Sequence, residues 1–99
     1  MRPEELKETG KRLFRAGQYT DAIPLLKSAV EAFPKDECLW MDLVLAARDS
    51  GQQEQAIEFT KQAIRLLPRS DWLWRQLGYE LLKTDLLDEA ERALYNAHR

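Results

Sequence analysis

The chain has 99 residues, of which 32% are charged and 44% hydrophobic, and its formal net charge at pH 7 is -2. This balance is typical of one soluble globular domain, and it disfavours a protein that binds nucleic acid by neutralising phosphates. No apolar run has the length of a membrane span, the single cysteine excludes an intrachain disulfide, and one cysteine with one histidine disfavours a zinc site.

Six helices in three consecutive pairs are predicted from the helical spacing of the apolar residues. The first pair is separated by a break at Ala16-Gly17-Gln18, the second at Asp49-Ser50-Gly51 and the third at Lys83-Thr84-Asp85. Glycine in the first two breaks supplies the left-handed conformation in which many helices end, and Asp85 takes that place at a modest cost. No alternation of strand type is present, so no sheet is expected.

Prolines mark the ends of the second helices in the first two pairs. Pro34 and Pro68 are expected just beyond those helix ends. Pro24 lies near the start of a helix instead. It is tolerated there if Thr20 is the N-cap residue, because the missing N–H then falls in the first turn and has no helical partner to lose.

The chain repeats itself at a constant interval, the one that separates Pro34 from Pro68. Five columns of residues keep this spacing: Leu6, Trp40 and Trp74; Gly17 and Gly51; Ala22, Ala56 and Ala90; Ala29, Ala63 and Ala97; Pro34 and Pro68. A period of about 34 residues is typical of stacked helical repeats. We therefore expect residues 1–99 to form a single domain of three units, 3–36, 37–70 and 71–99, of which the last is truncated.

At this spacing the residues resemble the tetratricopeptide repeat, whose pattern is W-x2-L-G-x2-Y, then A-x3-F, a further A and P over about 34 residues. The third unit matches it through Trp74-x2-Leu77-Gly78-x2-Leu81, Ala90-x3-Leu94 and Ala97. Departures are Val44 in place of glycine and Thr60 in place of a large apolar residue, which indicate local loosening. The resemblance covers residues 3–99.

The resemblance implies an all-α fold of three tandem helix-turn-helix repeats of about 34 residues each, stacked as a right-handed α-solenoid. In the family, the first helix of each unit lines the concave side and the second helix the convex side. Trp40 and Trp74 are then core residues. The opposite stripe of each first helix faces the groove, and the predicted partner-binding residues are Lys7, Lys11, Met41, Asp42, Leu45, Trp72, Arg75, Gln76 and Tyr79.

Trp72 and Tyr79 are expected to anchor a partner, and Arg75 to pair with a partner carboxylate. The alternative is that Trp72 and Tyr79 only pack on neighbouring helices, and that Met41 and Leu45 are half-buried filler. Cys38 is read as a small, inert residue because nothing nearby in sequence would activate its thiol.

The carboxylate clamp known in this family, which binds acidic chain termini, is not preserved here. Only Lys7 matches its residue types, whereas Lys11, Asp42, Trp72 and Gln76 replace the others. Asp42 is expected to select against acidic tails. A protein or peptide with an apolar or amphipathic segment therefore fits the predicted groove better.

Catalytic motifs are missing from the sequence. Gly10-Lys11-Arg12 does not complete a phosphate-binding loop, and no G-x-S-x-G elbow is present. The single histidine, His98, is the penultimate residue. We expect no enzyme, no metal and no cofactor.

The last predicted helix carries Leu94, Tyr95 and Ala97 where a following helix would pack. Either the chain is a fragment of a longer array, or another copy covers this end in a homodimer through the C-terminal helix. The sequence thus predicts a non-catalytic protein–protein interaction module that binds a peptide in its concave groove. The alternatives are a structural self-association element and a regulatory or docking fragment of a larger protein. Since no signal-type stretch opens the chain, a cytoplasmic protein without membrane or nucleic-acid partners is expected.

Overall fold

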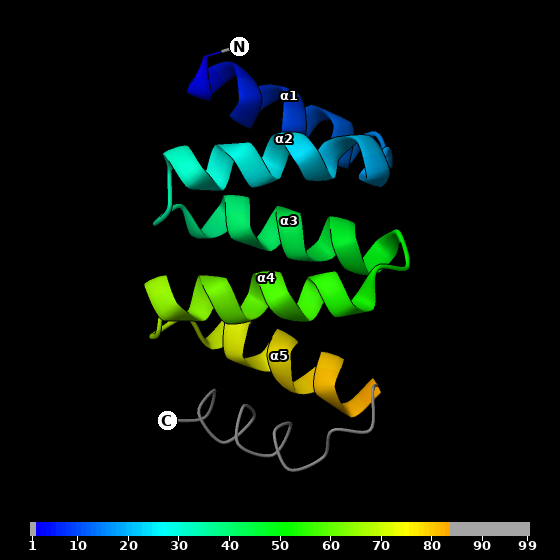
Figure 1. Cartoon of the computed structure of the whole chain (residues 1–99), viewed down its shortest axis with the longest axis vertical. Helices are drawn as coiled ribbons and strands as arrows, with labels where there is room; N and C mark the ends of the chain where they lie inside the picture. The colour runs from blue at the N-terminus through cyan, green and yellow to red at the C-terminus, as the bar shows by residue number, and fades with distance from the viewer. Residues whose placement is uncertain (1, 84–99) are drawn as a thin grey trace.

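The computed structural model describes residues 2–83, which form five α-helices and no strand. Consecutive helices run in alternating directions and stack one beside the next along the longest axis of the molecule (Figure 1). The helices are α1 (Pro3–Arg15), α2 (Tyr19–Ala32), α3 (Glu37–Asp49), α4 (Gln53–Leu66) and α5 (Asp71–Lys83). The predicted all-helical solenoid is confirmed. The sixth predicted helix lies outside the described residues.

The two helices of each of the first two pairs are joined by the same tight turn. Gly17 and Gly51 have φ angles of +78° and +85°, as predicted for glycine just past a helix end. The N–H of Gln18 then bonds the carbonyl of Leu13 at 2.9 Å. In the second turn the N–H of Gln52 donates to the carbonyl of Ala47 at 2.8 Å. The two turns, one repeat apart in sequence, therefore have the same backbone geometry.

Successive pairs are also joined in a repeated way. Helices α2 and α4 end two residues before Pro34 and Pro68, as predicted. The side chain of Asp36 caps α3 by accepting from the N–H of Leu39 at 3.3 Å. One repeat later, the N–H of Leu73 donates to the hydroxyl oxygen of Ser70 at the same distance.

The predicted start of α2 is wrong. The N-cap residue is Gln18 and not Thr20, so Pro24 stands inside the helix beyond its first turn. The glycine turn already places Gln18 at the cap, where its carbonyl accepts from the N–H of Ala22 at 3.0 Å. Proline at position 24 removes one helical hydrogen bond, and because both Pro24 and Thr20 are exposed, water can solvate the freed Thr20 carbonyl.

Close approach of α1 and α2 depends on a small residue. A Cβ atom on Gly10 would lie 2.9 Å from Cδ2 of Leu26 and 3.3 Å from the Leu26 backbone nitrogen. Ala22 and Ala29 on the facing helix are fully buried. The small residues of the repeat pattern therefore set the distance between paired helices.

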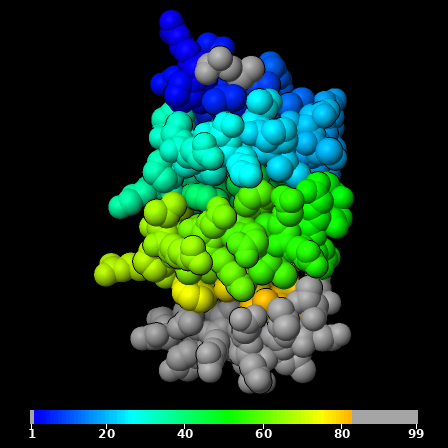
Figure 2. Space-filling view, viewed as in Figure 1, coloured from blue at the N-terminus to red at the C-terminus, as the bar shows by residue number. Residues whose placement is uncertain are grey.

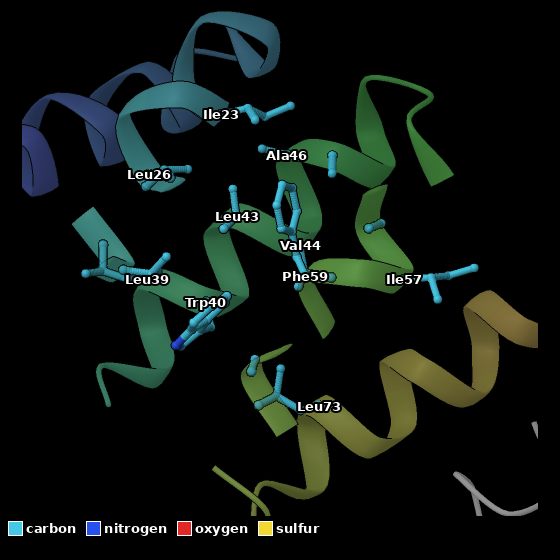
Figure 3. Packing of buried hydrophobic residues seen from close by; sticks show 14 of the residues in the cluster. Ile23, Leu26, Leu39, Trp40, Leu43, Val44, Ala46, Ile57, Phe59 and Leu73 are labelled. Carbon is cyan, nitrogen blue, oxygen red and sulfur yellow. The ribbon is translucent and has the colours of Figure 1, made fainter. Parts of the chain in front are cut away.

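The core runs continuously between the stacked helices. Side chains from α2, α3, α4 and α5 meet in it, including Leu26, Trp40, Phe59 and Leu73 (Figure 3). Trp40 is 4% exposed, which agrees with its predicted core position, while Trp74 is half-buried and packs against the same cluster. Thr60 is fully buried, and its hydroxyl donates to the carbonyl of Ala56 at 2.7 Å.

The space-filling view shows this stack as one elongated body in which the order along the chain is kept from the α1 end downward (Figure 2). Each described helix therefore touches its sequence neighbours, as expected for a quasi-one-dimensional repeat fold.

Candidate protein-interaction face

Helices α1, α3 and α5 present side chains on one side of the stack, which we call the first-helix face. Two long-range contacts link these helices. The Nζ atom of Lys7 donates to Oδ2 of Asp36 at 2.7 Å, which joins α1 to the cap of α3. The Nη1 atom of Arg48 donates to Oε1 of Gln76 at 2.8 Å, which joins α3 to α5.

Lys7, a predicted partner contact, is occupied within the chain. Besides its ion pair with Asp36, its Nζ atom lies 5.4 Å from the centre of the Phe33 ring. The hydrogen bond and charge of Asp36 raise the pKa of Lys7. Burial favours a higher pKa for Asp36, but the hydrogen bonds from Lys7 and Leu39 and the nearby positive charges lower it. Lys7 therefore helps to hold α1 against the start of α3.

Asp42 lies half-buried on α3 within the field of two cations of α1. Burial raises the pKa of its carboxyl group, whereas the charges of Lys11 and Arg15 oppose that shift and the charge of Asp36 adds to it. Arg15 was not among the predicted site residues, although it follows Lys11 by one helical turn. Because two cations offset one carboxylate, this part of the face is not dominated by negative charge.

Arg48 is the second residue that the sequence reading missed. Its Nε atom lies 3.7 Å from Oδ1 of Asp49 and 4.0 Å from Oε1 of Glu80, whose side chain is fully buried. The repeat pattern could have pointed to Arg48. The equivalent positions one repeat earlier and one repeat later hold Phe14 and Leu82, so Arg48 is a charged residue at a position that is apolar in the other two repeats.

The α5 part of the first-helix face carries the aromatic residues. Tyr79 is 50% exposed, and Arg75 is also exposed. Trp72 and Gln76 are half-buried, and Trp72 packs against the core. Helical spacing places these four residues on one stripe of α5. On α3, Met41 and Leu45 are half-buried, and Cys38 is exposed.

The opposite side of the stack holds a pocket that the sequence reading did not anticipate. It opens between α2 and α4, has a volume of about 230 Å³, and is lined by Val30, Trp40, Leu43, Phe59 and Leu66 together with flanking polar residues. Most of these apolar side chains are core residues, and Leu66, which is 40% exposed, forms part of its rim.

Within residues 2–83 there is no group of three or more side chains suited to hold a metal ion. Over the same range, none of the helices has the length and apolar character needed to cross a membrane. His98 and the apolar residues Leu94, Tyr95 and Ala97 lie outside the described residues.

Comparison with known proteins agrees with the repeated geometry. The tetratricopeptide repeat family matches residues 13–61. Over residues 13–61, the chain belongs to the tetratricopeptide-repeat family. A comparison with curated proteins found no match.

Solved structures of MamA share the fold of this tetratricopeptide-repeat chain. An RS-1 MamA double mutant is 26% identical with a TM-score of 0.86, and the match covers 97% of this chain and 54% of that one. MamA from Desulfovibrio magneticus RS-1 is 27% identical with a TM-score of 0.82, over 94% and 52% of the two chains. AMB-1 MamA is 23% identical with a TM-score of 0.88, over 98% and 53%, and shows the fold alone. The present chain thus spans about half the length of these MamA chains.

The family match over residues 13–61 and the stacked helical architecture support a protein-interaction or scaffold module. Repeats of this kind expose long, rigid surfaces on which partners bind. On this chain, the α5 part of the first-helix face carries an exposed aromatic side chain beside an exposed cation.

Proposed function

We propose that the chain is a non-catalytic interaction module that binds a peptide segment of a partner protein on its first-helix face, the concave side in the family. The observation that carries the proposal is the exposure of Tyr79, which is 50% exposed and shares a stripe of α5 with Trp72. Large aromatic side chains are common anchors in protein interfaces because they bury much apolar surface at a low cost in conformational entropy.

The nine predicted contact residues divide into three roles under this proposal. Tyr79, Trp72 and Arg75 on α5 provide the anchor and a cation. Met41 and Leu45 extend the apolar surface on α3, and both are half-buried. The remaining four shape the polar edge: Lys7 and Gln76 through their contacts with Asp36 and Arg48, and Lys11 and Asp42 through their opposite charges.

This arrangement favours an amphipathic or apolar segment over a strongly charged one. The α5 stripe offers two aromatic rings at helical spacing, which suits side chains repeated every three or four residues in a partner helix. The net charge of -2 gives no reason to propose nucleic acid as the partner. For localisation, we propose that the chain meets its partner in the cytoplasm.

A capture experiment tests the proposal. The tagged chain and its Trp72→Ala/Tyr79→Ala variant are used as baits in a lysate of the source organism, and bound proteins are identified by mass spectrometry. Truncating two interface anchors is expected to weaken binding by about 2 kcal/mol or more. A specific partner should therefore be lost with the variant.

The matched control is Leu66→Ala. Leu66 is also a large exposed apolar residue, but it lies at the pocket between α2 and α4. Circular dichroism must show that both variants keep the helical fold. Retention of the same partner by the folded Trp72→Ala/Tyr79→Ala variant would place binding elsewhere on the molecule.

Self-association is the second candidate function. Leu82, near the end of α5, is 40% exposed, and it precedes the apolar residues predicted for the last helix. A contact through this end would bury Leu82 between two copies. Light scattering over a range of concentrations tests it: a mass that rises with concentration, and falls back for Leu82→Glu, supports a homodimer. A regulatory or docking role within a larger protein is a further alternative.

A further inference from the structure

We propose that Arg48 orients the side-chain amide of Gln76 so that its N–H groups face outward, and that the first-helix face therefore takes an amphipathic segment with an internal Asp or Glu between large apolar side chains. This inference rests on the proposed function, since it specifies the partner of the same face. It differs from recognition of a chain terminus, because the acidic group lies within the segment.

The orientation of the amide follows from the chemistry of the two side chains. A guanidinium group has only N–H donors, so the atom that faces Arg48 must be an acceptor. Oε1 of Gln76 occupies that place, 2.8 Å from Nη1 of Arg48. The amide is planar, and its Nε2 atom is therefore directed away from Arg48. No residue within 2–83 accepts a hydrogen bond from Nε2.

Arg48 itself has two carboxylates within 4.0 Å. Its Nε atom lies 3.7 Å from the Asp49 carboxylate and 4.0 Å from the Glu80 carboxylate. Glu80 is fully buried, whereas the Arg48 side chain is 27% exposed. Moving the guanidinium group away would deprive a buried carboxylate of a nearby positive charge, which is costly in a low-dielectric interior. Gln76 therefore cannot turn its oxygen outward without giving up this contact.

The neighbours of Gln76 complete a surface of donors between two rings. Arg75, the preceding residue, adds an exposed guanidinium group, and Trp72 and Tyr79 flank the pair by one helical turn on either side. A partner carboxylate can accept hydrogen bonds from both Gln76 and Arg75 while its apolar neighbours contact the rings. At Gln76 and Arg75 a partner lysine would meet N–H donors and a positive charge, so charge complementarity at these two residues favours the acidic segment.

Three carboxylates on α3 and α5 do not reverse that preference, while the exposed Asp71 lies one helical turn before Arg75, towards the start of α5. Glu80 is buried and Asp49 lies against Arg48. Asp42, on α3, stands in the field of Lys11 and Arg15. None of these three groups offers an uncompensated negative charge to the partner position beside Gln76.

The test uses three fluorescein-labelled peptides with acetylated and amidated ends, designed as amphipathic helices with leucines two turns apart, at positions i and i+7, to match the spacing of Trp72 and Tyr79. They differ at position i+4, on the same face as the leucines, which is Glu, Gln or Lys. Fluorescence anisotropy gives the dissociation constants. One charge-assisted hydrogen bond corresponds to about a tenfold effect on affinity. The Glu peptide is thus expected to bind the chain about tenfold more tightly than the Gln peptide, and the Lys peptide most weakly.

Gln76→Glu is the decisive variant. The new carboxylate can still accept from Arg48, so the fold is retained, but the second oxygen now faces the partner in place of an N–H donor. The preference for the Glu peptide should disappear or reverse. Gln55→Glu is the matched control, because it makes the same charge change at an exposed position on α4 and should leave the preference intact.

A second variant tests the role of Arg48 as a positioning residue. Arg48→Gln/Glu80→Gln neutralises both members of the contact, and glutamine at position 48 can accept as well as donate. The preference for the Glu over the Gln peptide should fall, although the anchors Trp72 and Tyr79 are untouched. If Arg48 had only a structural role, this double variant would weaken the binding of all three peptides by the same factor.

Equal affinities for the three peptides, or an unchanged preference in Gln76→Glu, would overturn the inference while leaving the proposed face intact. So would tighter binding of the Lys peptide. If no peptide binds although a cellular partner is lost with Trp72→Ala/Tyr79→Ala, the partner chemistry inferred here is wrong and the face itself stands.

Discussion

The indole Nε1 of Trp40 donates a hydrogen bond of 2.8 Å to the carbonyl oxygen of Pro34. Trp74 and Pro68 repeat this contact at the same distance in the next repeat. In both cases the tryptophan near the start of one helical hairpin donates to the proline that follows the end of the preceding hairpin. Two columns of the repeat pattern thus meet in one contact between successive repeats.

Replacement of Trp40 by phenylalanine should destabilise the fold more than the same change at Trp74. Trp40 is 4% exposed, so Trp40→Phe leaves a cavity as well as removing the hydrogen bond, and a loss of about 2 kcal/mol is expected. Trp74 is half-buried, and its loss is expected to be smaller. Urea unfolding followed by circular dichroism measures both, and an equal or reversed order would contradict this view of the core.

Gly51 should tolerate asparagine better than valine. Its φ of +85° is unfavourable for a β-branched residue, and no side-chain contact within 4 Å would add to the strain. Gly51→Val is expected to cost about 1–2 kcal/mol, and Gly51→Asn less. Thermal unfolding of the two variants gives the comparison. Equal stabilities of the two variants would show that the left-handed backbone conformation is not the reason why glycine is favoured at position 51.

The ion pair between Lys7 and Asp36 should stabilise the fold over a wide pH range. The pKa of Asp36 is lowered from its ordinary 3.8, so its contribution is complete above that value and is lost as the pH falls through the lower folded pKa. The pKa of Lys7 is raised from 10.5, so its contribution is lost only as the pH rises through the higher folded value. Asp36→Asn should therefore destabilise the chain at pH 7 and have a smaller effect near pH 2. A constant effect at both pH values would argue against the pair.

Asp42 should show the opposite dependence. Its pKa is raised from 3.8, chiefly by burial, so the charged form costs stability at neutral pH and this cost disappears as the pH falls below the ordinary value. Asp42→Asn is expected to stabilise the chain slightly at pH 7 and not at pH 3. Chemical unfolding at the two pH values tests this. Destabilisation at pH 7 would mean that the attraction to Lys11 and Arg15 outweighs the burial of the carboxylate.

The sequence predicted those features of the fold that repeat along the chain. Gly51 and Pro68 could be placed because each has a counterpart one repeat earlier. The start of α2 could not, because the backbone of the preceding glycine turn puts Gln18 at the cap, and the better capping side chain of Thr20 comes two residues too late.

For the candidate site, helical spacing predicts which residues share a stripe but not which side chains pair across helices. Helical spacing places residues such as Arg75 and Tyr79 on one stripe. The contacts of Lys7 with Asp36 and of Arg48 with Gln76 join residues 29 and 28 positions apart, the first linking α1 to the cap of α3 and the second linking α3 to α5. They depend on the packing of one hairpin on the next, which no local pattern of residues specifies.

The central claim is that partners bind on the first-helix face, and site-specific photocrosslinking tests it most directly. The photoreactive amino acid benzoylphenylalanine is placed at Tyr79 in one variant and at Leu66, on the opposite side, in another. On irradiation in the source cells, position 79 should yield a discrete adduct with a partner protein and position 66 should not. The same adduct from position 66, with none from position 79, would contradict the account.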